Sequence, residues 1–118
     1  MIGVLPDIAI RNMTETGEIS AEAQVTPEQV QPASLDLRLG NVAYRVRASF
    51  LAPGGATVAR RLDSFTMHNI NLTGGAVLEK GCVYVVPLME SLALADDVSA
   101  VANAKSSTGR LDLLTRTI

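Results

Sequence analysis

Hydrophobic and polar residues alternate along much of this 118-residue chain. In residues 34–39 three leucines fall on one side of the alternation and polar side chains on the other, which predicts a strand. Residues 44–50 alternate in the same way. The turn signal Gly40-Asn41 lies between the two segments, so they are predicted to pair as a hairpin.

Further elements follow from the same reading. Strands are predicted at residues 65–72, 82–88, 90–94 and 98–102. The stretch 82–88 is apolar on both faces, which is typical of a strand buried between two sheets, and Pro87 marks its bend or end. A short helix is predicted at residues 5–13, ended by Gly17, with a helical turn at residues 57–62 and loop with short extended pieces at residues 19–30.

Many short strands with turns every eight to twelve residues indicate a mainly β fold: a sandwich, jelly roll or distorted barrel. The length suits a single domain over residues 1–118. Apolar residues make up 47% of the chain and aromatic residues 3%, with no Trp. The core is therefore expected to consist of Val, Leu, Ile and Ala.

Composition also excludes several classes of function. A net charge of -2 and few aromatic side chains argue against binding nucleic acid. No apolar run is long enough for a membrane span, and the first residues lack a basic signal-peptide start, so a cytoplasmic protein is expected. One His and one Cys cannot by themselves supply three protein ligands to zinc.

The richest chemistry lies in the six residues from Lys105 to Arg110, which we call the hexad. The hexad holds two cations, three hydroxyls and a glycine. Lys and Arg donate charge-assisted hydrogen bonds, and glycine lets a ligand approach the backbone closely. This pattern favours a phosphate cradle, although the same composition is common in solvated loops. It is not a Walker loop, because GxxxxGK[ST] is absent.

Asp36 is the acidic residue that most invites a functional reading. It alternates with Leu35 and Leu37 and so points away from the face that the leucines occupy. One interpretation is a carboxylate in a sheet-facing site. The other is a solvated side chain or one paired with Arg38, its neighbour on the same face, and spacing alone favours this second interpretation.

Two segments together carry a resemblance to a known family. The segment from Gln31 to Gly40 resembles the first motif of the dCTP deaminase/dUTPase superfamily, and that from Ala102 to Leu111 resembles its phosphate-binding second motif. Residues 3–7 and 78–81 also resemble dCTP deaminase. The likeness runs over residues 3–118 and is greatest to the N-terminal part of the long type, which has two β-domains in one polypeptide.

The resemblance implies a dUTPase-like jelly roll or distorted β-barrel with a short N-terminal helix. It implies a homotrimer or trimer-like assembly with sites at interfaces. The implied reaction is hydrolytic deamination of dCTP to dUTP and ammonia, in pyrimidine nucleotide metabolism. The family uses no zinc, and Mg²⁺ arrives on the nucleotide triphosphate.

The resemblance also assigns roles to site residues. Ser106, which orients the attacking water, and Arg110, which supports the site and the ligand's charge, are the expected catalytic residues. The expected phosphate-binding or nucleotide-binding residues are Lys105, Ser106, Ser107, Thr108, Gly109 and Arg110. Asp36 matches the aspartate of the first motif, and its role is left open.

The general base of the family is a glutamate downstream of the serine–arginine motif, and no residue of this chain matches it. We therefore expect an N-terminal fragment or a naturally shortened copy, truncated at its C-terminus and inactive alone. Two alternatives remain: a dUTP pyrophosphatase, which shares both motifs, and a non-catalytic nucleotide-binding or assembly module. Either dUTP or dTTP is then a further possible ligand.

Overall fold

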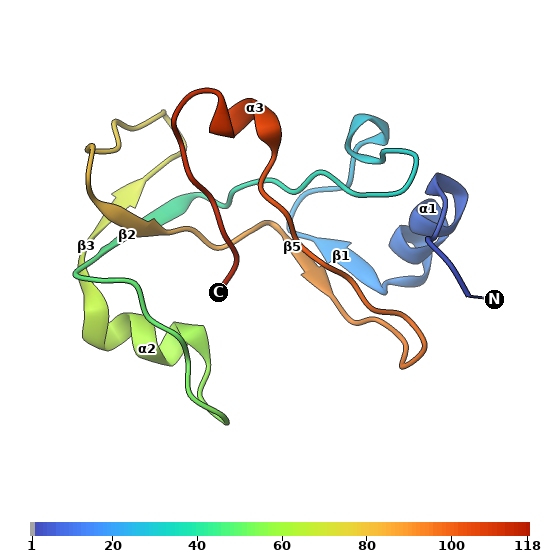
Figure 1. The fold of residues 1–118 in the computed structure, drawn as a ribbon, viewed down its shortest axis with the longest axis horizontal. Helices are drawn as coiled ribbons and strands as arrows, with labels where there is room; N and C mark the ends of the chain where they lie inside the picture. Colours follow the sequence, from blue (N-terminus) through green and yellow to red (C-terminus); the bar gives the residue numbers. More distant parts are fainter. Residues whose placement is uncertain (1) are drawn as a thin grey trace.

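The structure is a computed structural model that describes residues 2–118 and contains two antiparallel sheets (Figure 1). In chain order the elements are α1 (Asp7–Thr16), β1 (Ile19–Ala21), η1 (Pro27–Gln29), β2 (Val42–Val46), α2 (Val58–Phe65), β3 (Thr66–Asn71), β4 (Val83–Val85), β5 (Glu90–Leu92) and α3 (Ser106–Gly109). Strands β1 and β5 form a two-stranded sheet, and a second sheet has the order β3-β2-β4.

Each sheet has its own small core. The core beside β1 and β5 contains Ile10, Met13 and Ile19. The core beside β2 and α2 contains Val46, Phe50 and Leu62. The radius of gyration is 15.8 Å, against about 13.5 Å for a compact domain of this length. The chain is therefore elongated, with two packed halves and α3 lying between them in the view of Figure 1.

Two segments of chain cross between the halves and pair with each other. The N–H of Gly40 donates to the carbonyl of Pro87 at 2.7 Å, and the N–H of Met89 donates to the carbonyl of Arg38 at 3.0 Å. An isolated antiparallel bridge between Leu39 and Leu88 lies in the same stretch. These contacts join the half that contains β1 to the half that contains β2.

The β-rich framework and the short N-terminal helix are confirmed. Helix α1 ends at Gly17, whose φ of 87° is in the left-handed region that glycine favours. Strands β3 and β5 lie inside the predicted strands at residues 65–72 and 90–94, and α2 extends the predicted helical turn. None of the helices within residues 2–118 is long and apolar enough to cross a membrane.

The predicted hairpin between residues 34–39 and 44–50 is wrong. Strand β2 pairs with β3 and β4 instead. The backbone of residues 34–40 is bonded to residues 29–31 on one side and to residues 87–89 on the other, which leaves it only isolated bridges. The leucines do not form a buried face, since the exposed fractions of Leu37 and Leu39 are 44% and 57%.

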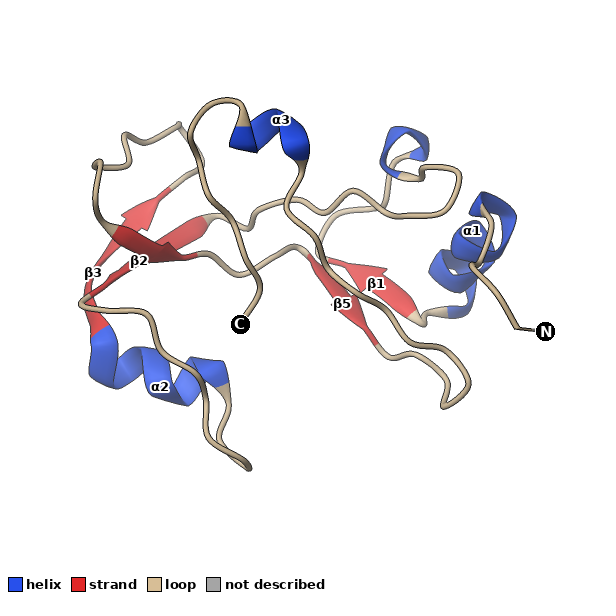
Figure 2. Cartoon of the chain, viewed as in Figure 1, coloured by secondary structure: helices blue, strands red, loops and turns tan. Residues whose placement is uncertain are grey.

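Two other strand predictions also need correction. In the stretch 82–88 only β4 is a strand; it lies at the edge of its sheet, and Val83 is 41% exposed. It is therefore not buried between two sheets. Residues 98–102 form no strand, and Val101 is exposed. Figure 2 shows this stretch as loop leading to α3.

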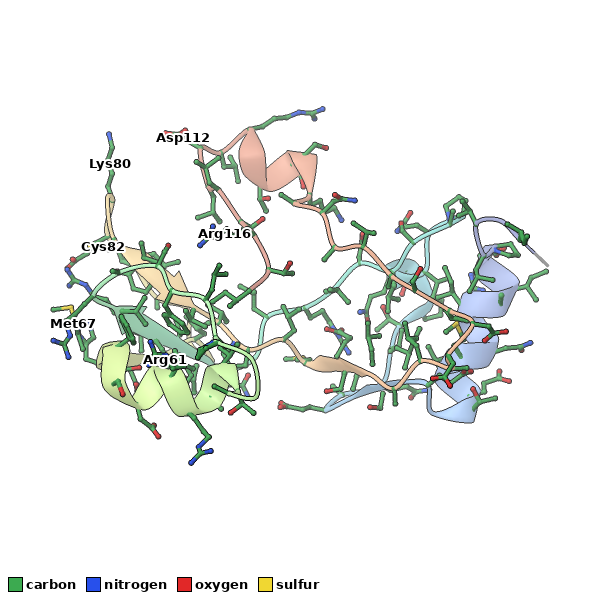
Figure 3. All side chains as sticks on the ribbon, turned by 60° about the horizontal axis from the view of Figure 1, so that its bottom comes forward. Arg61, Met67, Lys80, Cys82, Asp112 and Arg116 are labelled. Carbon is green, nitrogen blue, oxygen red and sulfur yellow. The ribbon has the colours of Figure 1, made fainter. Side chains whose placement is uncertain are left out.

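Cys82 illustrates how the sheet changes a local reading. As a residue beside an apolar run it suggests a small core side chain, but it is only half-buried, next to β4 (Figure 3). Arg45 of β2 donates to its Sγ at 3.1 Å and forms an ion pair with Glu79 at 2.9 Å. The side chain of Lys80, in the turn just before Cys82, extends away from the chain in Figure 3.

Gly40 is required where the two crossing segments meet. A Cβ placed on Gly40 would lie 2.8 Å from the carbonyl oxygen of Pro87, a backbone atom that cannot swing aside. We expect Gly40→Ala to lower the free energy of unfolding by about 1–3 kcal/mol through overpacking. Chemical denaturation measures this loss.

Gly74→Ala is the matched control, because a Cβ there meets nothing within 4 Å. Equal stabilities of the two variants would show that the crossing segments do not approach each other as closely as described.

Candidate functional site

The hexad folds as one helical turn. Lys105 has extended backbone, with φ of -74° and ψ of 130°, and α3 starts at the next residue. The carbonyl of Lys105 accepts hydrogen bonds from the N–H groups of Thr108 and Gly109 at 3.1 and 3.4 Å. It also accepts one from the Thr108 hydroxyl at 2.6 Å. The hexad is thus folded by its own backbone and one of its own hydroxyls.

The remaining polar groups of the hexad face solvent. Ser106, Ser107 and Arg110 are exposed, and within residues 2–118 Arg110 forms no ion pair. Hydroxyl and guanidinium donors in this state are available to an anionic ligand. No three His, Cys, Asp or Glu side chains of the described chain gather as metal ligands would.

Asp36 and Lys105 connect the two sequence motifs. The Nζ of Lys105 lies 2.6 Å from Oδ2 of Asp36, although the residues are 69 positions apart. The side chain of Lys105 is 61% exposed and that of Asp36 is 34% exposed. The predicted pairing of Asp36 with Arg38 is wrong, although the side chain is partly solvated as expected: its partners are Lys105 and, at 3.5 Å, the amide of Gln31.

Arg38 has a different partner, the buried carboxylate of Glu90. The Arg38 Nε lies 2.8 Å from Glu90 Oε1, and the Arg38 backbone N–H donates to Oε2 at 2.9 Å. The other guanidinium nitrogens donate to the carbonyls of Ala23 and Gln24. Arg38 is therefore bonded to two separate parts of the chain, residues 23–24 and Glu90.

Gln29, at the end of η1, completes the cluster. Its Nε2 donates to Glu90 Oε1 and to the carbonyl of Asp36, both at 2.9 Å. Its Oε1 accepts from the N–H of Thr26 at 2.9 Å. We call Gln29, Arg38 and Glu90 the polar cluster. The polar cluster contacts the backbone of Asp36 through Gln29.

The electrostatics of Glu90 follow from its surroundings. Burial alone would raise its pKa, because a charged carboxylate loses hydration. Hydrogen bonds from the Arg38 backbone, the Arg38 guanidinium and the Gln29 amide act in the opposite direction, and the net effect is a lowered pKa. Glu90 is thus held as a carboxylate, with only 1% of its side chain exposed.

Reading the sequence missed Glu90 and Gln29. A signal for Gln29 was present, because Thr26 and Gln29 have the T-x-x-Q spacing of a capping box, which also predicts the short helix η1. Glu90 gave only a weak signal, a single acid after the apolar run that ends at Met89.

Comparison with known proteins places this chain in a family. The sequence profile of the 2′-deoxycytidine 5′-triphosphate deaminase N-terminal domain matches residues 1–118. The chain belongs to this family. The resemblance seen in the two motifs is thereby confirmed, and the Asp36–Lys105 contact joins those two motifs of a dCTP deaminase N-terminal domain.

Individual relatives named dCTP deaminase agree with this family assignment. The chain is 30% identical over 113 residues to the dCTP deaminase of Natronomonas pharaonis, covering 94% of this chain and 58% of that protein. It is 32% identical over 113 residues to a dCTP deaminase, dUMP-forming, of Methanospirillum hungatei, covering 93% and 57%. The chain therefore spans somewhat more than half the length of these curated relatives.

A solved structure supports the fold. The crystal structure of 2′-deoxycytidine 5′-triphosphate deaminase from Agrobacterium tumefaciens is similar with a TM-score of 0.90 and 59% sequence identity. The likeness covers 93% of this chain and 33% of that one. The expected β fold of the dCTP deaminase/dUTPase kind is confirmed.

The lowered pKa of Glu90 predicts that acid weakens the fold. The stabilisation from this carboxylate is fully present above the ordinary glutamate pKa of about 4.3 and is lost as pH falls through the lower folded-state pKa. We expect Glu90→Gln to lower the free energy of unfolding at pH 7 by about 2–4 kcal/mol. The variant should also lose part of the dependence on acid, as measured by denaturation between pH 7 and pH 2.

Glu28→Gln is the control, since Glu28 is exposed on η1. It should stay within about 0.5 kcal/mol of the parent at every pH. A Glu90→Gln variant with the same acid dependence as the parent would contradict the lowered pKa.

Proposed function

We propose that this chain supplies the triphosphate-binding part of a dCTP deaminase, which hydrolyses dCTP to dUTP and ammonia in the cytoplasm. The observation that carries the proposal is the 2.6 Å contact between Asp36 and Lys105. It brings the two motifs of the family together at an exposed turn that is rich in donors for phosphate.

Each phosphate contact has a physical basis. Lys105 supplies a point charge next to the phosphates, and Arg110 forks onto phosphate oxygens or stabilises charge that develops during the reaction. The hydroxyl of Ser107 donates to the same oxygens, and Thr108, whose hydroxyl donates to the Lys105 carbonyl, contributes by shaping the turn that meets them. Gly109 lets the triphosphate approach the backbone, since it has no Cβ.

Asp36 prepares this site by orienting Lys105. Their ion pair keeps the ammonium at the start of α3, where a triphosphate would meet the exposed hydroxyls of the hexad. Magnesium belongs to the substrate in this proposal, because it arrives bound to the triphosphate oxygens that it prefers.

The chemical step needs a water and a general base. In our proposal Ser106 orients the water, and a glutamate outside the 118 residues removes its proton and returns it to the ring nitrogen and the leaving ammonia. Zinc takes no part. Within this division of roles the present chain binds and orients the substrate and does not complete turnover alone.

We also propose that the complete site forms between subunits of a trimer or trimer-like assembly. Leu111, Leu113 and Leu114 directly follow the hexad and are 80%, 46% and 89% exposed. Apolar side chains grouped in this way are common where another protein surface packs. Such a surface would enclose the substrate that the exposed hexad binds.

Two other functions remain distinct from deamination and are separated by one assay. A dUTP pyrophosphatase would release pyrophosphate from dUTP, and a non-catalytic module would bind nucleotide without turnover. Some relatives are named dUMP-forming, so pyrophosphate and ammonia should both be measured with dCTP. Ammonia without pyrophosphate supports the proposed reaction when this chain is assayed together with the part of the enzyme that supplies the general base, whereas this chain alone should bind dCTP without turnover.

Arg110 provides the first test of the binding site. We expect Arg110→Ala to weaken binding of Mg·dCTP by about 10- to 100-fold, because a charge-assisted hydrogen bond to phosphate is lost. Isothermal titration calorimetry measures this change. Arg60→Ala is the matched control, since Arg60 is an exposed arginine on α2 in the other half of the chain. Equal affinities of the two variants would refute the proposed role of Arg110.

Gly109 separates a ligand effect from a folding effect. A Cβ there meets nothing within 4 Å, and Gly109 is helical without a positive φ. Gly109→Ala should therefore leave the free energy of unfolding unchanged or raise it by up to about 1 kcal/mol. The same methyl group should weaken Mg·dCTP binding by about tenfold if phosphate approaches this backbone. Unchanged affinity would show that the triphosphate lies elsewhere.

A further inference from the structure

We propose that Glu90 and Gln29 are positioning residues for the nucleotide site: they hold Asp36 so that its carboxylate fixes Lys105. This inference rests on the proposed function. It concerns two residues that belong to neither motif and that the hexad itself does not include.

Gln29 holds the main chain of Asp36 on both sides. The N–H of Asp36 donates to the carbonyl of Gln29 at 2.8 Å. The carbonyl of Asp36 accepts from Gln29 Nε2 at 2.9 Å. With both backbone groups bonded to one buried residue, the direction in which the Asp36 side chain leaves the backbone is fixed.

Glu90 extends this control to the neighbouring positions. Its two carboxylate oxygens accept from the Gln29 amide and from the backbone N–H and Nε of Arg38. This carboxylate thus holds Arg38 directly and Asp36 through Gln29. A change at Glu90 therefore changes the setting of Asp36 without any contact between their side chains.

The difference in burial between the Asp36–Lys105 pair and the polar cluster shows which of them determines the position of Asp36. Asp36 and Lys105 form an exposed ion pair, and exposed pairs contribute too little to order a segment by themselves. In the polar cluster, by contrast, Gln29 and Glu90 are buried and bonded to each other and to Arg38, whose side chain is 28% exposed. The Glu90 side chain is 1% exposed, so it cannot reach a bound nucleotide and acts only through the residues that it holds.

A double-mutant cycle on Mg·dCTP affinity tests the proposal. The proteins are the parent, Asp36→Ala, Glu90→Gln and the double variant, compared by calorimetry at a temperature where circular dichroism shows all four folded. We expect each single variant to bind about tenfold more weakly, as for one lost charge-assisted contact. The double variant should bind within about twofold of Asp36→Ala, because Glu90 acts through Asp36.

Two other roles of Glu90 give different results. If Glu90 only stabilises the fold, Glu90→Gln should bind Mg·dCTP within about twofold of the parent, and if it affects binding independently of Asp36, the two effects should multiply to about a hundredfold. Either result overturns the proposal. Leu62→Ala is the control, because it destabilises the other core and should change affinity by less than about twofold. If Glu90→Gln does not fold, Gln29→Met replaces it, since this change removes the side-chain hydrogen bonds from Gln29 to the Asp36 carbonyl and to Glu90 and keeps the Arg38–Glu90 pair.

The outcomes also distinguish this inference from the proposed function. A parent protein that does not bind Mg·dCTP overturns the proposed function and the inference with it. A parent that binds, with Asp36→Ala or Glu90→Gln unchanged in affinity, overturns the inference alone and leaves the hexad as the phosphate site.

Discussion

The buried carboxylate of Glu90 is the interaction on which the arrangement of this chain depends. It lies at the start of β5, and its partners come from η1 and from the segment that crosses to the other sheet. A buried charge is costly unless donors replace its hydration. Here three donors do so, and the lowered pKa shows that their effect outweighs that of burial. The same bonds set the crossing segments in register.

The candidate site inherits its geometry from this framework. Breaking a buried charge pair costs about 3–5 kcal/mol, whereas an exposed ion pair contributes about 0–1 kcal/mol. The contact between Asp36 and Lys105 belongs to the second kind. It reports where the polar cluster has placed Asp36 and adds little stability of its own. An exposed pair of this kind is also easily rearranged when a ligand with more charge arrives, which suits a site that must exchange a triphosphate.

Local signals in the sequence predicted the local structure well. The helix predicted at residues 5–13 and ended by Gly17 is confirmed as α1, and the strand predicted at residues 65–72 contains β3. The hairpin prediction was wrong because a glycine such as Gly40 can have either of two structural roles. A glycine before Asn is typical of a tight turn, but here it allows the Pro87 carbonyl to approach within hydrogen-bonding distance. Only the pairing of distant segments distinguishes these cases, and alternation within one segment carries no information about its partner.

The candidate site also has a part that local sequence predicts and a part that it does not. The hexad could be found from the sequence because its cations, hydroxyls and glycine are contiguous. The partner of Asp36 could not, since Lys105 is 69 residues away and Arg38, the nearer cation, is already bonded to Glu90. The donors to Glu90 are themselves 52 and 61 residues distant along the chain. An isolated acidic residue beside an apolar strand is either exposed or buried with several hydrogen-bond donors around its carboxylate. The buried arrangement is stable only when other segments of the chain supply those donors. The position of a buried carboxylate such as Glu90 therefore shows where distant segments are held together.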